Sequence, residues 1–286
     1  MALDDIIWID AAGVQTGLND HDAAWSTRMR DGFWSPPFQV NSSDYPQQPG
    51  SVFNFVKTGE RVVNLSVEVR APDHMALTGL YRNLAYRLNP ERGAGRLRMS
   101  MNGSKYQREL ICRSGGLTKV SERETSASLI LTFLANDPYW YDVDQSSASF
   151  MLNQAAAFFP IFPIVLVNSS SFATANIDNT GDVETWPVWT INGPASNLII
   201  THSDGKKIDL TGVSLTSAEW LVIDTAAKTI NKESPYSSVS VLEYLSLDSS
   251  LFSFSPGTNN LTIQLSDSVY GATMVTASYY LRWLTP

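Results

Sequence analysis

Three aspartates beside aromatic residues form the part of this sequence that most resembles a catalytic site. Asp137, Asp142 and Asp144 flank Tyr139 and Trp140. A pair of carboxylates across a sugar-binding cleft is the arrangement with which glycosidases cleave a glycan. The dipeptide Asp137-Pro138 has a simpler explanation, because aspartate accepts hydrogen bonds within its own turn and proline fixes φ. We therefore favour a structural turn here and expect no enzymatic activity.

The other residues that could perform catalysis or bind a metal are isolated. His21, His74 and His202 are the three histidines, and none has a second ligand at the spacing of a zinc site. The sequence has no Gly-x-Ser-x-Gly elbow for a serine nucleophile and no glycine-rich phosphate loop. Cys112 is the one cysteine and lies in an apolar run, which predicts a buried thiol. We expect no cofactor and no metal.

Aromatic residues in the second half suggest a binding function as an alternative. Their rings could stack on carbohydrate, or they could pack between two sheets, where tryptophans contribute most of their buried area. We favour core packing, and a carbohydrate-binding module for host cell-wall glycan remains the alternative function. The residues concerned are Trp186, Trp189, Trp220, Tyr236 and Tyr244.

Composition predicts a folded protein without a nucleic-acid partner. Of the 286 residues, 43% are hydrophobic, 11% aromatic and only 17% charged, which argues against disorder. The net charge of −8 is uneven, since residues 1–145 hold 15 basic and 17 acidic residues and residues 146–286 hold 5 and 11. Tight nucleic-acid binding requires a basic surface. We therefore expect no specific nucleic acid.

Targeting signals are not evident in the sequence. The first ten residues are acidic and lack a basic start, so we expect no signal peptide. The longest apolar stretch, residues 155–167, contains two prolines and is too short to span a bilayer. The single cysteine favours folding in a reducing cytoplasm. We expect no membrane segment.

Periodicity in the first half predicts strands around one helix. Arg61–Arg70 alternates apolar and polar residues, as a half-buried strand does. The apolar stripe of residues 77–88 predicts a helix over Asp73–Leu88, with Asp73 as N-cap. Ser42–Gly50 is polar and predicts a loop or arm. Strands are further predicted at residues 6–9, 96–101, 106–113 and 126–135, with a hairpin turn at 102–103 and a break at 115–116.

The second half predicts an all-β domain. Residues 145–157 show no clear period, so we place the domain boundary near 145–150. Short strands with regular turns then predict a sandwich or jelly roll. In the last predicted strand, residues 275, 277, 279, 281 and 283 form one apolar face. The predicted strands span residues 164–168, 188–191, 197–202, 207–210, 219–224, 229–231, 261–265 and 273–283.

The order of these features resembles the distal tail protein family of long-tailed, non-contractile bacteriophages, whose members are tail-tip or baseplate hub components. The similarity extends over nearly the whole chain. It includes the element order of the first half, the stretch Gly181–Pro187 and several motif residues. These are Asp137, Pro138, Tyr139, Trp140, Asp224, Pro256, Gly257 and Asn259.

The resemblance implies a mainly β fold and a structural role. Residues 1–147 would form a β-sandwich-like domain with one packed helix, which builds a hexameric ring at the distal end of the tail tube. Residues 148–286 would form a galectin-like sandwich. The implied partners are further copies of the chain, the tail tube protein, the tail-associated hub protein, and receptor-binding proteins or fibres. The implied location is the virion tail tip, after synthesis in the host bacterial cytoplasm.

One departure, one alternative and one further expectation accompany the resemblance. The chain has no segment for the inserted carbohydrate-binding modules of some members, so we expect an adaptor rather than a lectin. A connector of a related contractile tail or injection machine is a further alternative. Ring interfaces favour aromatics and arginine over lysine, and arginine occupies 12 of the 15 basic positions in residues 1–145. We expect Phe33, Trp34 and Tyr81 near subunit contacts.

Overall fold

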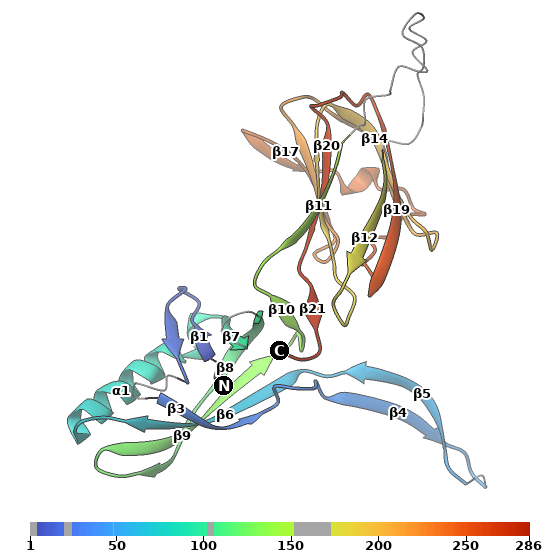
Figure 1. The fold of residues 1–286 in the computed structure, drawn as a ribbon. Helices are drawn as coiled ribbons and strands as arrows, with labels where there is room; N and C mark the ends of the chain where they lie inside the picture. The colour runs from blue at the N-terminus through green and yellow to red at the C-terminus, as the bar shows by residue number, and fades with distance from the viewer. Residues whose placement is uncertain (1–4, 20–24, 48, 102–105, 152–172) are drawn as a thin grey trace, which may run out of the picture. The chain divides into compact units, whose positions relative to one another are not determined.

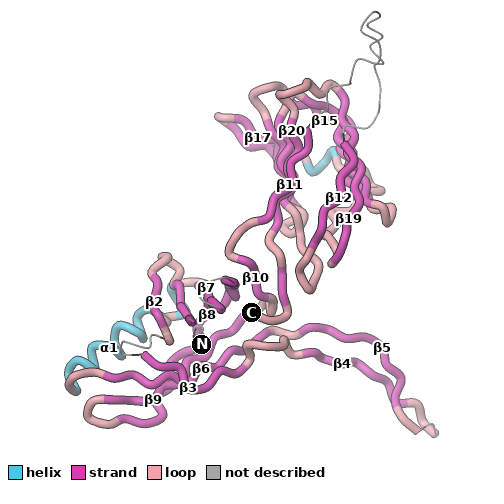
Figure 2. The backbone as a smooth tube through the Cα atoms, in the orientation of Figure 1, coloured by secondary structure: helices cyan, strands magenta, loops and turns pink. Residues whose placement is uncertain are grey.

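The chain folds into two compact units built almost entirely from antiparallel strands (Figures 1 and 2). The computed structural model describes residues 5–19, 25–47, 49–101, 106–151 and 173–286. The first unit comprises Met1–Val143 and Trp283–Pro286, and the second comprises Asp144–Arg282. The mainly β fold with one long helix confirms the predicted class. The turn predicted at 102–103, the strand predicted at 164–168 and His21 lie outside the described residues.

A nine-stranded sheet forms most of the N-terminal unit. Its main path runs β2-β1-β7-β8-β9-β6-β3, and β10 and β21 extend it beside β8. Trp8 on β1 contacts Phe133 on β9 with ring centroids 5.0 Å apart, so both halves of the sheet share one core. The strands are β1 (Asp5–Ile9), β2 (Gln15–Gly17), β3 (Trp25–Asp31), β6 (Arg61–Arg70), β7 (Gly95–Met101), β8 (Tyr106–Glu122), β9 (Ser126–Ala135), β10 (Trp140–Asp142) and β21 (Arg282–Trp283).

The predicted strand and helix of this unit have the predicted bounds. Strand β6 buries alternate residues from Val63 to Val69. Helix α1 (His74–Arg87) begins after Asp73, whose Oδ1 accepts a hydrogen bond from the Ala76 amide at 2.7 Å. It packs on the sheet through buried Leu77 and Leu84. A short 3-10 helix, η1 (Pro90–Arg92), follows.

Strand β8 is longer than the sequence suggested. The glycines at 115–116 were expected to end it, yet pairing with β9 continues to Glu122. The register shifts between Ser114 and Gly116, where a β-bulge absorbs the extra residue. The first half of β8 pairs with β7 and the second half with β9. A single strand therefore joins the two halves of the sheet.

Strands β4 (Phe38–Asp44) and β5 (Ser51–Thr58) form a separate two-stranded hairpin, here called the arm. The expected loop over Ser42–Gly50 is thus partly strand. Six of its large apolar side chains are roughly half exposed or more, and all of its paired residues apart from Thr58 are exposed. Within the described part of the chain, no further strand pairs with the arm. These side chains are Phe38, Val40, Val52, Phe53, Phe55 and Val56.

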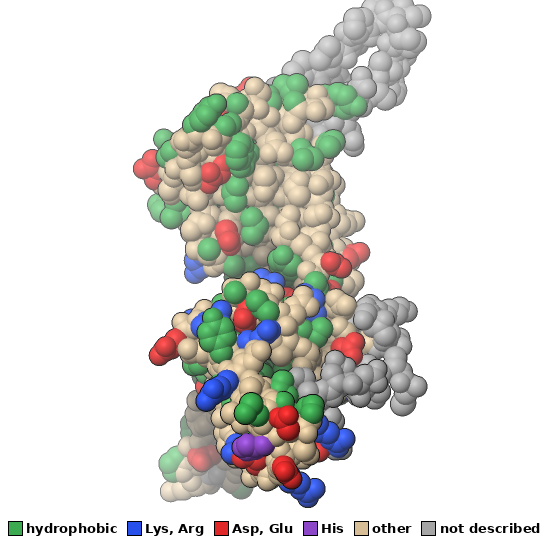
Figure 3. All heavy atoms as spheres, turned by 90° about the vertical axis from the view of Figure 1, so that its left-hand side faces the viewer, with side chains coloured by type: hydrophobic (Ala, Val, Ile, Leu, Met, Phe, Trp, Pro, Cys, Tyr) green, Lys and Arg blue, Asp and Glu red, His purple; other side chains and the backbone are tan. Residues whose placement is uncertain are grey.

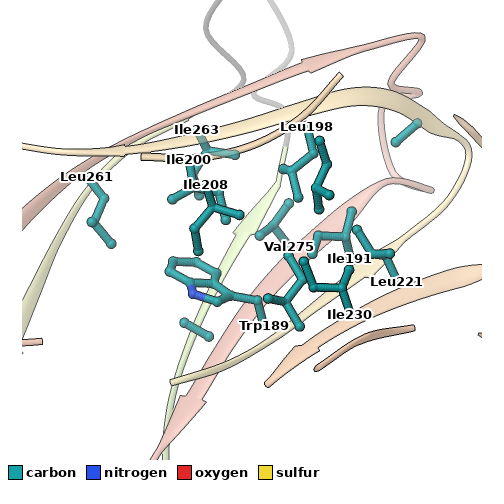
Figure 4. Packing of buried hydrophobic residues seen from close by; sticks show 14 of the residues in the cluster. Trp189, Ile191, Leu198, Ile200, Ile208, Leu221, Ile230, Leu261, Ile263 and Val275 are labelled. Carbon is teal, nitrogen blue, oxygen red and sulfur yellow. The ribbon is translucent and has the colours of Figure 1, made fainter. Parts of the chain in front are cut away.

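The C-terminal unit is a sandwich of two antiparallel sheets. One sheet has the order β11-β20-β13-β16-β17-β18 and the other β12-β19-β14-β15. Trp189 lies between them among aliphatic residues of both sheets (Figure 4). The galectin-like character remains a prediction. The elements are β11 (Ser146–Met151), β12 (Ala173–Asn179), β13 (Val188–Asn192), β14 (Ala195–His202), β15 (Lys207–Leu215), β16 (Trp220–Asp224), β17 (Thr229–Ser234), β18 (Ser237–Ser240), η2 (Leu242–Tyr244), β19 (Gly257–Ser266) and β20 (Met274–Tyr279).

The last predicted strand is in fact two strands in different units. Strand β20 ends at Tyr279, and Trp283 belongs to β21 in the N-terminal sheet. Val275, Ala277 and Tyr279 form the expected buried face, but Trp283 is not part of it. The domain expected over 148–286 therefore lacks its last four residues, which return to the first unit.

We expect Asp73→Ala to lower the free energy of unfolding of the N-terminal unit by about 1 kcal/mol, because the Ala76 amide loses its cap. Urea unfolding followed by far-ultraviolet circular dichroism would measure the change. Glu124→Ala is the control, since this exposed turn carboxylate caps no helix. Equal stability of Asp73→Ala and Glu124→Ala would contradict the assigned cap.

Candidate structural site: a buried arginine at the start of β6

Arg61 is fully buried and joins four segments of the N-terminal unit. Its side chain is 0% exposed. Nε donates to the Pro138 carbonyl at 2.6 Å, and Nη1 donates to the carbonyls of Gly32 at 3.1 Å and Phe33 at 2.6 Å. Nη2 donates to the Leu284 carbonyl at 2.8 Å. One guanidinium thus connects β6, the loop before the arm, the Asp-Pro turn and the last residues of the chain.

The loop at Gly32 and Phe33 reaches the guanidinium because position 32 is glycine. Gly32 has φ +76°, and a Cβ there would lie 2.0 Å from the Val62 carbonyl oxygen. Only glycine accommodates both this backbone conformation and this close approach. The loop therefore lies directly against β6 and presents two carbonyls to Arg61.

Trp140 closes the other side of this site. Its indole Nε1 donates to the Phe33 carbonyl at 3.1 Å, and its ring stacks on Phe33 with centroids 5.7 Å apart. The Arg61 guanidinium carbon lies 5.9 Å from the Trp140 ring centroid, within the range of a cation–π interaction. Both aromatic rings are about 1% exposed or less, so they exclude water from the cation.

The motif Asp137-Pro138-Tyr139 forms the turn whose Pro138 carbonyl accepts a hydrogen bond from Arg61. Asp137 Oδ1 accepts from the Tyr139 amide at 3.3 Å, and Oδ2 accepts from the Tyr141 hydroxyl. The Tyr139 hydroxyl donates to Thr58 Oγ1 at 3.2 Å at the end of the arm. These contacts use the aspartate as a turn residue and aim the Pro138 carbonyl at Arg61.

A second arginine holds the returning end of the chain. Arg108 Nη1 donates to the Thr285 carbonyl at 2.8 Å, and its guanidinium carbon lies 3.9 Å from the Trp283 ring centroid. Asp142 Oδ1 accepts from Trp283 Nε1 at 2.8 Å and lies 3.5 Å from Arg108 Nε. Asp142 is thus part of a structural clamp.

The electrostatics of Arg61 suit a structural link rather than a ligand site. Burial lowers the pKa of Arg61 to about 10, so the side chain remains a cation at neutral pH. Its acceptors are backbone carbonyls of the chain itself. Four of the five guanidinium N–H groups thus donate within the chain, and the side chain is buried, so it has no surface with which to bind an anion from solvent.

The motif residues of the C-terminal unit also form turns. Asp224 Oδ1 accepts from the amides of Ala226 and Ala227 at 2.9 and 2.8 Å. Asn259 is 2% exposed, and its side chain accepts from the Ser255 amide at 3.0 Å and donates to the Gly257 carbonyl at 3.0 Å. Gly257 has φ +93°, which favours glycine after Pro256. These residues fix the entry into β19.

The three residues expected at subunit contacts differ in exposure. Phe33 is 1% exposed and packs on Trp140, so its own side chain lies inside the unit, and its position near a subunit contact stays a prediction. Trp34 is 62% exposed and remains available for a contact. Tyr81 is partly buried, and its pKa is raised mainly by burial and also by Glu122.

The remaining candidates, His74, His202 and Cys112, all lie among the described residues. Within them, no group of three or more His, Cys, Asp or Glu side chains could hold a metal ion. His74 is an exposed surface residue 4.0 Å from Glu122. His202 Nδ1 lies 2.7 Å from Asp204 and Nε2 3.2 Å from Asn259. Cys112 is buried, and burial raises the pKa of its thiol to about 12.

The tryptophans considered as a sugar-binding surface are not exposed. Trp189 is 0% exposed in the core, while Trp186 and Trp220 are partly buried. Only Tyr236 and Tyr244 are exposed, at 98% and 47%. None of the described helices has the length and apolar character needed to span a membrane.

Sequence reasoning missed Arg61, although a signal was present. The alternation of Arg61–Arg70 places Arg61 on the same face as Val63 and Leu65. A charged residue on the buried face of a strand requires a partner. That partner consists of carbonyls from three distant segments, and the pattern of residues 61–70 carries no information about them.

Part of the chain matches a family model, and the fold of the whole chain resembles solved structures. Residues 180–283 match the family model described as the siphovirus-type tail component, C-terminal domain. The fold resembles the crystal structure of SPP1 Dit (gp 19.1), described as a paradigm of the hub adsorption apparatus in phages that infect Gram-positive bacteria. That match has a TM-score of 0.72 and 12% identity and covers 99% of this chain and 100% of the other.

A chain of the phage P2 baseplate in its activated conformation with Ca is also similar. It aligns with a TM-score of 0.53 and 9% identity over 97% of this chain and 98% of the other. The same baseplate with Sr aligns with a TM-score of 0.53 and 10% identity. No curated protein sequence matches the chain.

We expect Arg61→Met to lower the free energy of unfolding of the N-terminal unit by roughly 3–5 kcal/mol, because several buried carbonyls lose their donor. Arg70→Met at the other end of β6 is the matched control. Its side chain is 66% exposed and pairs only with Glu68 on the surface, so we expect a change below about 1 kcal/mol. Urea unfolding of both variants measures the difference, and similar midpoints would refute the role assigned to Arg61.

Proposed function

We propose that this chain, whose residues 180–283 match the family model of the siphovirus-type tail component, C-terminal domain, is a structural connector at the tip of a phage tail. The N-terminal unit would form a closed hexameric ring at the distal end of the tail tube. The C-terminal unit would serve as an adaptor. The protein would be made in the cytoplasm of the bacterial host and would have no enzymatic activity.

The comparisons support this assignment through fold and family. The SPP1 protein is described as part of a hub adsorption apparatus, and the P2 chains belong to a baseplate. We extend that role to this chain. Its neighbours would be the tail tube protein, the tail-associated hub protein, and receptor-binding proteins or fibres.

The observation that carries the ring assembly is the uncovered arm. Phe38, Val40, Phe53 and Phe55 are 51–64% exposed, although isolated two-stranded hairpins are marginally stable in water. Val40 lies opposite Val56, and the next pair brings Phe55 to the other face of the hairpin, so apolar side chains are exposed on both faces. Exposed apolar side chains gathered on one hairpin in this way are characteristic of an interaction site. Burying each phenylalanine against a neighbour would contribute about 1.5–3 kcal/mol.

The arrangement of the arm favours a ring over a two-fold dimer. The arm is a sheet separate from the N-terminal sheet, whose path ends at β2 and β3. The two sheets therefore offer different surfaces of the same unit. An arm that packs on a different surface of the next copy makes a heterologous interface, which closes into a ring when the rotation allows. Exposed Trp34 lies four residues before β4 and would extend the same interface.

We expect Phe55→Asp to weaken self-association at least about tenfold, because the aspartate must be desolvated at the interface. Multi-angle light scattering of the purified full chain would then show a shift towards the 31.5 kDa monomer. The unchanged chain should elute at six times this mass. Negative-stain images of that peak should show hollow rings.

Tyr270→Asp is the matched control, because Tyr270 is 59% exposed in the C-terminal unit and Phe55 is 55% exposed in the arm. This variant should retain the ring. A monomeric unchanged chain, or equal loss of the ring in both variants, would count against arm-mediated assembly. Trp34→Asp tests the loop in the same way.

A further inference from the structure

The C-terminal unit carries an apolar surface along one side of its sandwich, here called the edge surface. It consists of Tyr236, Val239, Leu242, Tyr244 and Leu247, which are 98%, 56%, 44%, 47% and 103% exposed. They come from one continuous segment through β18 and η2. The side of the molecule on which β17 lies in Figure 1 faces the viewer in Figure 3, where hydrophobic and acidic side chains of this unit lie close together.

The segment is held firmly although its side chains are exposed. The Val241 amide donates to the Ile230 carbonyl at 2.9 Å, and Val241 itself is buried. The Ser246 and Ser250 amides donate to the Asp209 and Lys207 carbonyls at 3.0 and 2.8 Å. The segment therefore crosses from the edge of one sheet to the edge of the other, and covers the edge of β15.

Among the strands that the structure describes, β18 is an open edge of its sheet. It is the last strand in the order β11-β20-β13-β16-β17-β18 and pairs with β17 on one side. All four of its residues are exposed. An open edge offers backbone donors and acceptors to an added strand, while neighbouring apolar side chains supply specificity.

The charge of the edge surface is uniformly acidic. Residues 233–250 contain Glu233, Glu243 and Asp248 but no lysine or arginine. Glu243 and Asp248 are exposed. The nearest lysine on β17, Lys232, lies 2.9 Å from Glu219, and Lys207 lies 3.4 Å from Asp209. These cations are already engaged with other carboxylates.

We propose that the edge surface docks an extended segment of a neighbouring protein in which apolar residues alternate with lysine or arginine. The segment adds as a strand to β18, places its apolar side chains on Tyr236 and Leu247, and pairs its cations with Glu243 and Asp248. Self-association through two copies of this surface would instead bring like charges together. The proposal rests on the connector function, because a connector must hold a neighbouring protein.

The test uses the full chain and a fluorescent peptide of alternating leucine and lysine. A peptide of the same length with alternating leucine and glutamate is the control. Anisotropy should show binding of the lysine peptide that weakens as salt rises. Tyr236→Ser/Leu247→Ser should weaken it at least tenfold. Val269→Ser/Tyr270→Ser, which changes two residues exposed to 48% and 59% elsewhere in the unit, should leave it unchanged.

Hydrogen–deuterium exchange distinguishes addition of a strand to β18 from nonspecific binding of the peptide. Bound lysine peptide should slow exchange at residues 237–240. No binding to the unchanged chain, equal binding by both double variants, equal binding of the glutamate peptide, or unprotected β18 would each overturn the proposal.

Light scattering of the same samples keeps this result separate from ring assembly. The Tyr236→Ser/Leu247→Ser variant should retain the mass of the unchanged chain. A loss of mass in this variant would identify a second copy as the occupant of the edge surface and overturn the proposal. Loss of the ring in Phe55→Asp bears only on the connector function.

Discussion

The N-terminal unit depends on satisfying one buried cation. Arg61 cannot remain charged without hydrogen-bond acceptors. The free-energy cost of burying an unpaired charge is larger than any surface contact can offset. Its acceptors are backbone carbonyls at positions 32, 33, 138 and 284. The loop before the arm, the Asp-Pro turn and the returning chain must therefore all reach one point. The aromatic rings of Phe33 and Trp140 cover that point and make the hydrogen bonds stronger by excluding water.

This constraint explains how the unit can display an arm that has no core of its own. Tyr139 contacts Thr58 at the base of the arm, and the Phe33 loop leads into its first strand. The base is thus fixed to the rigid site around Arg61, while the apolar side chains beyond it stay uncovered. In the C-terminal unit, by contrast, both sheets bury their facing side chains around Trp189. The arm therefore differs from the rest of both units in that its strands expose apolar side chains without a core of their own.

Sequence alone predicted the elements whose signal is local. The alternation of β6, the stripe and caps of α1 and the long apolar strand β9 all depend on residues adjacent in the chain, and their bounds agree with the structure. The sequence did not predict the acceptors of Arg61, the bulge that extends β8 past Gly116 or the transfer of Trp283 to the other unit. Each of these depends on pairing between distant segments. The burial of Phe33 was not predicted for the same reason, because it depends on the approach of Trp140 from a distant segment.

The path of the chain has a mechanical consequence for a connector. The C-terminal unit is inserted between β10 and β21, which pair with each other in the N-terminal sheet. It is therefore tethered through two chain crossings, at 143–144 and 282–283, rather than through one linker. Asp142, Arg108 and Trp283 clamp the two crossings on the N-terminal side. Separating the two crossings from each other therefore requires breaking both the pairing of β10 with β21 and this clamp.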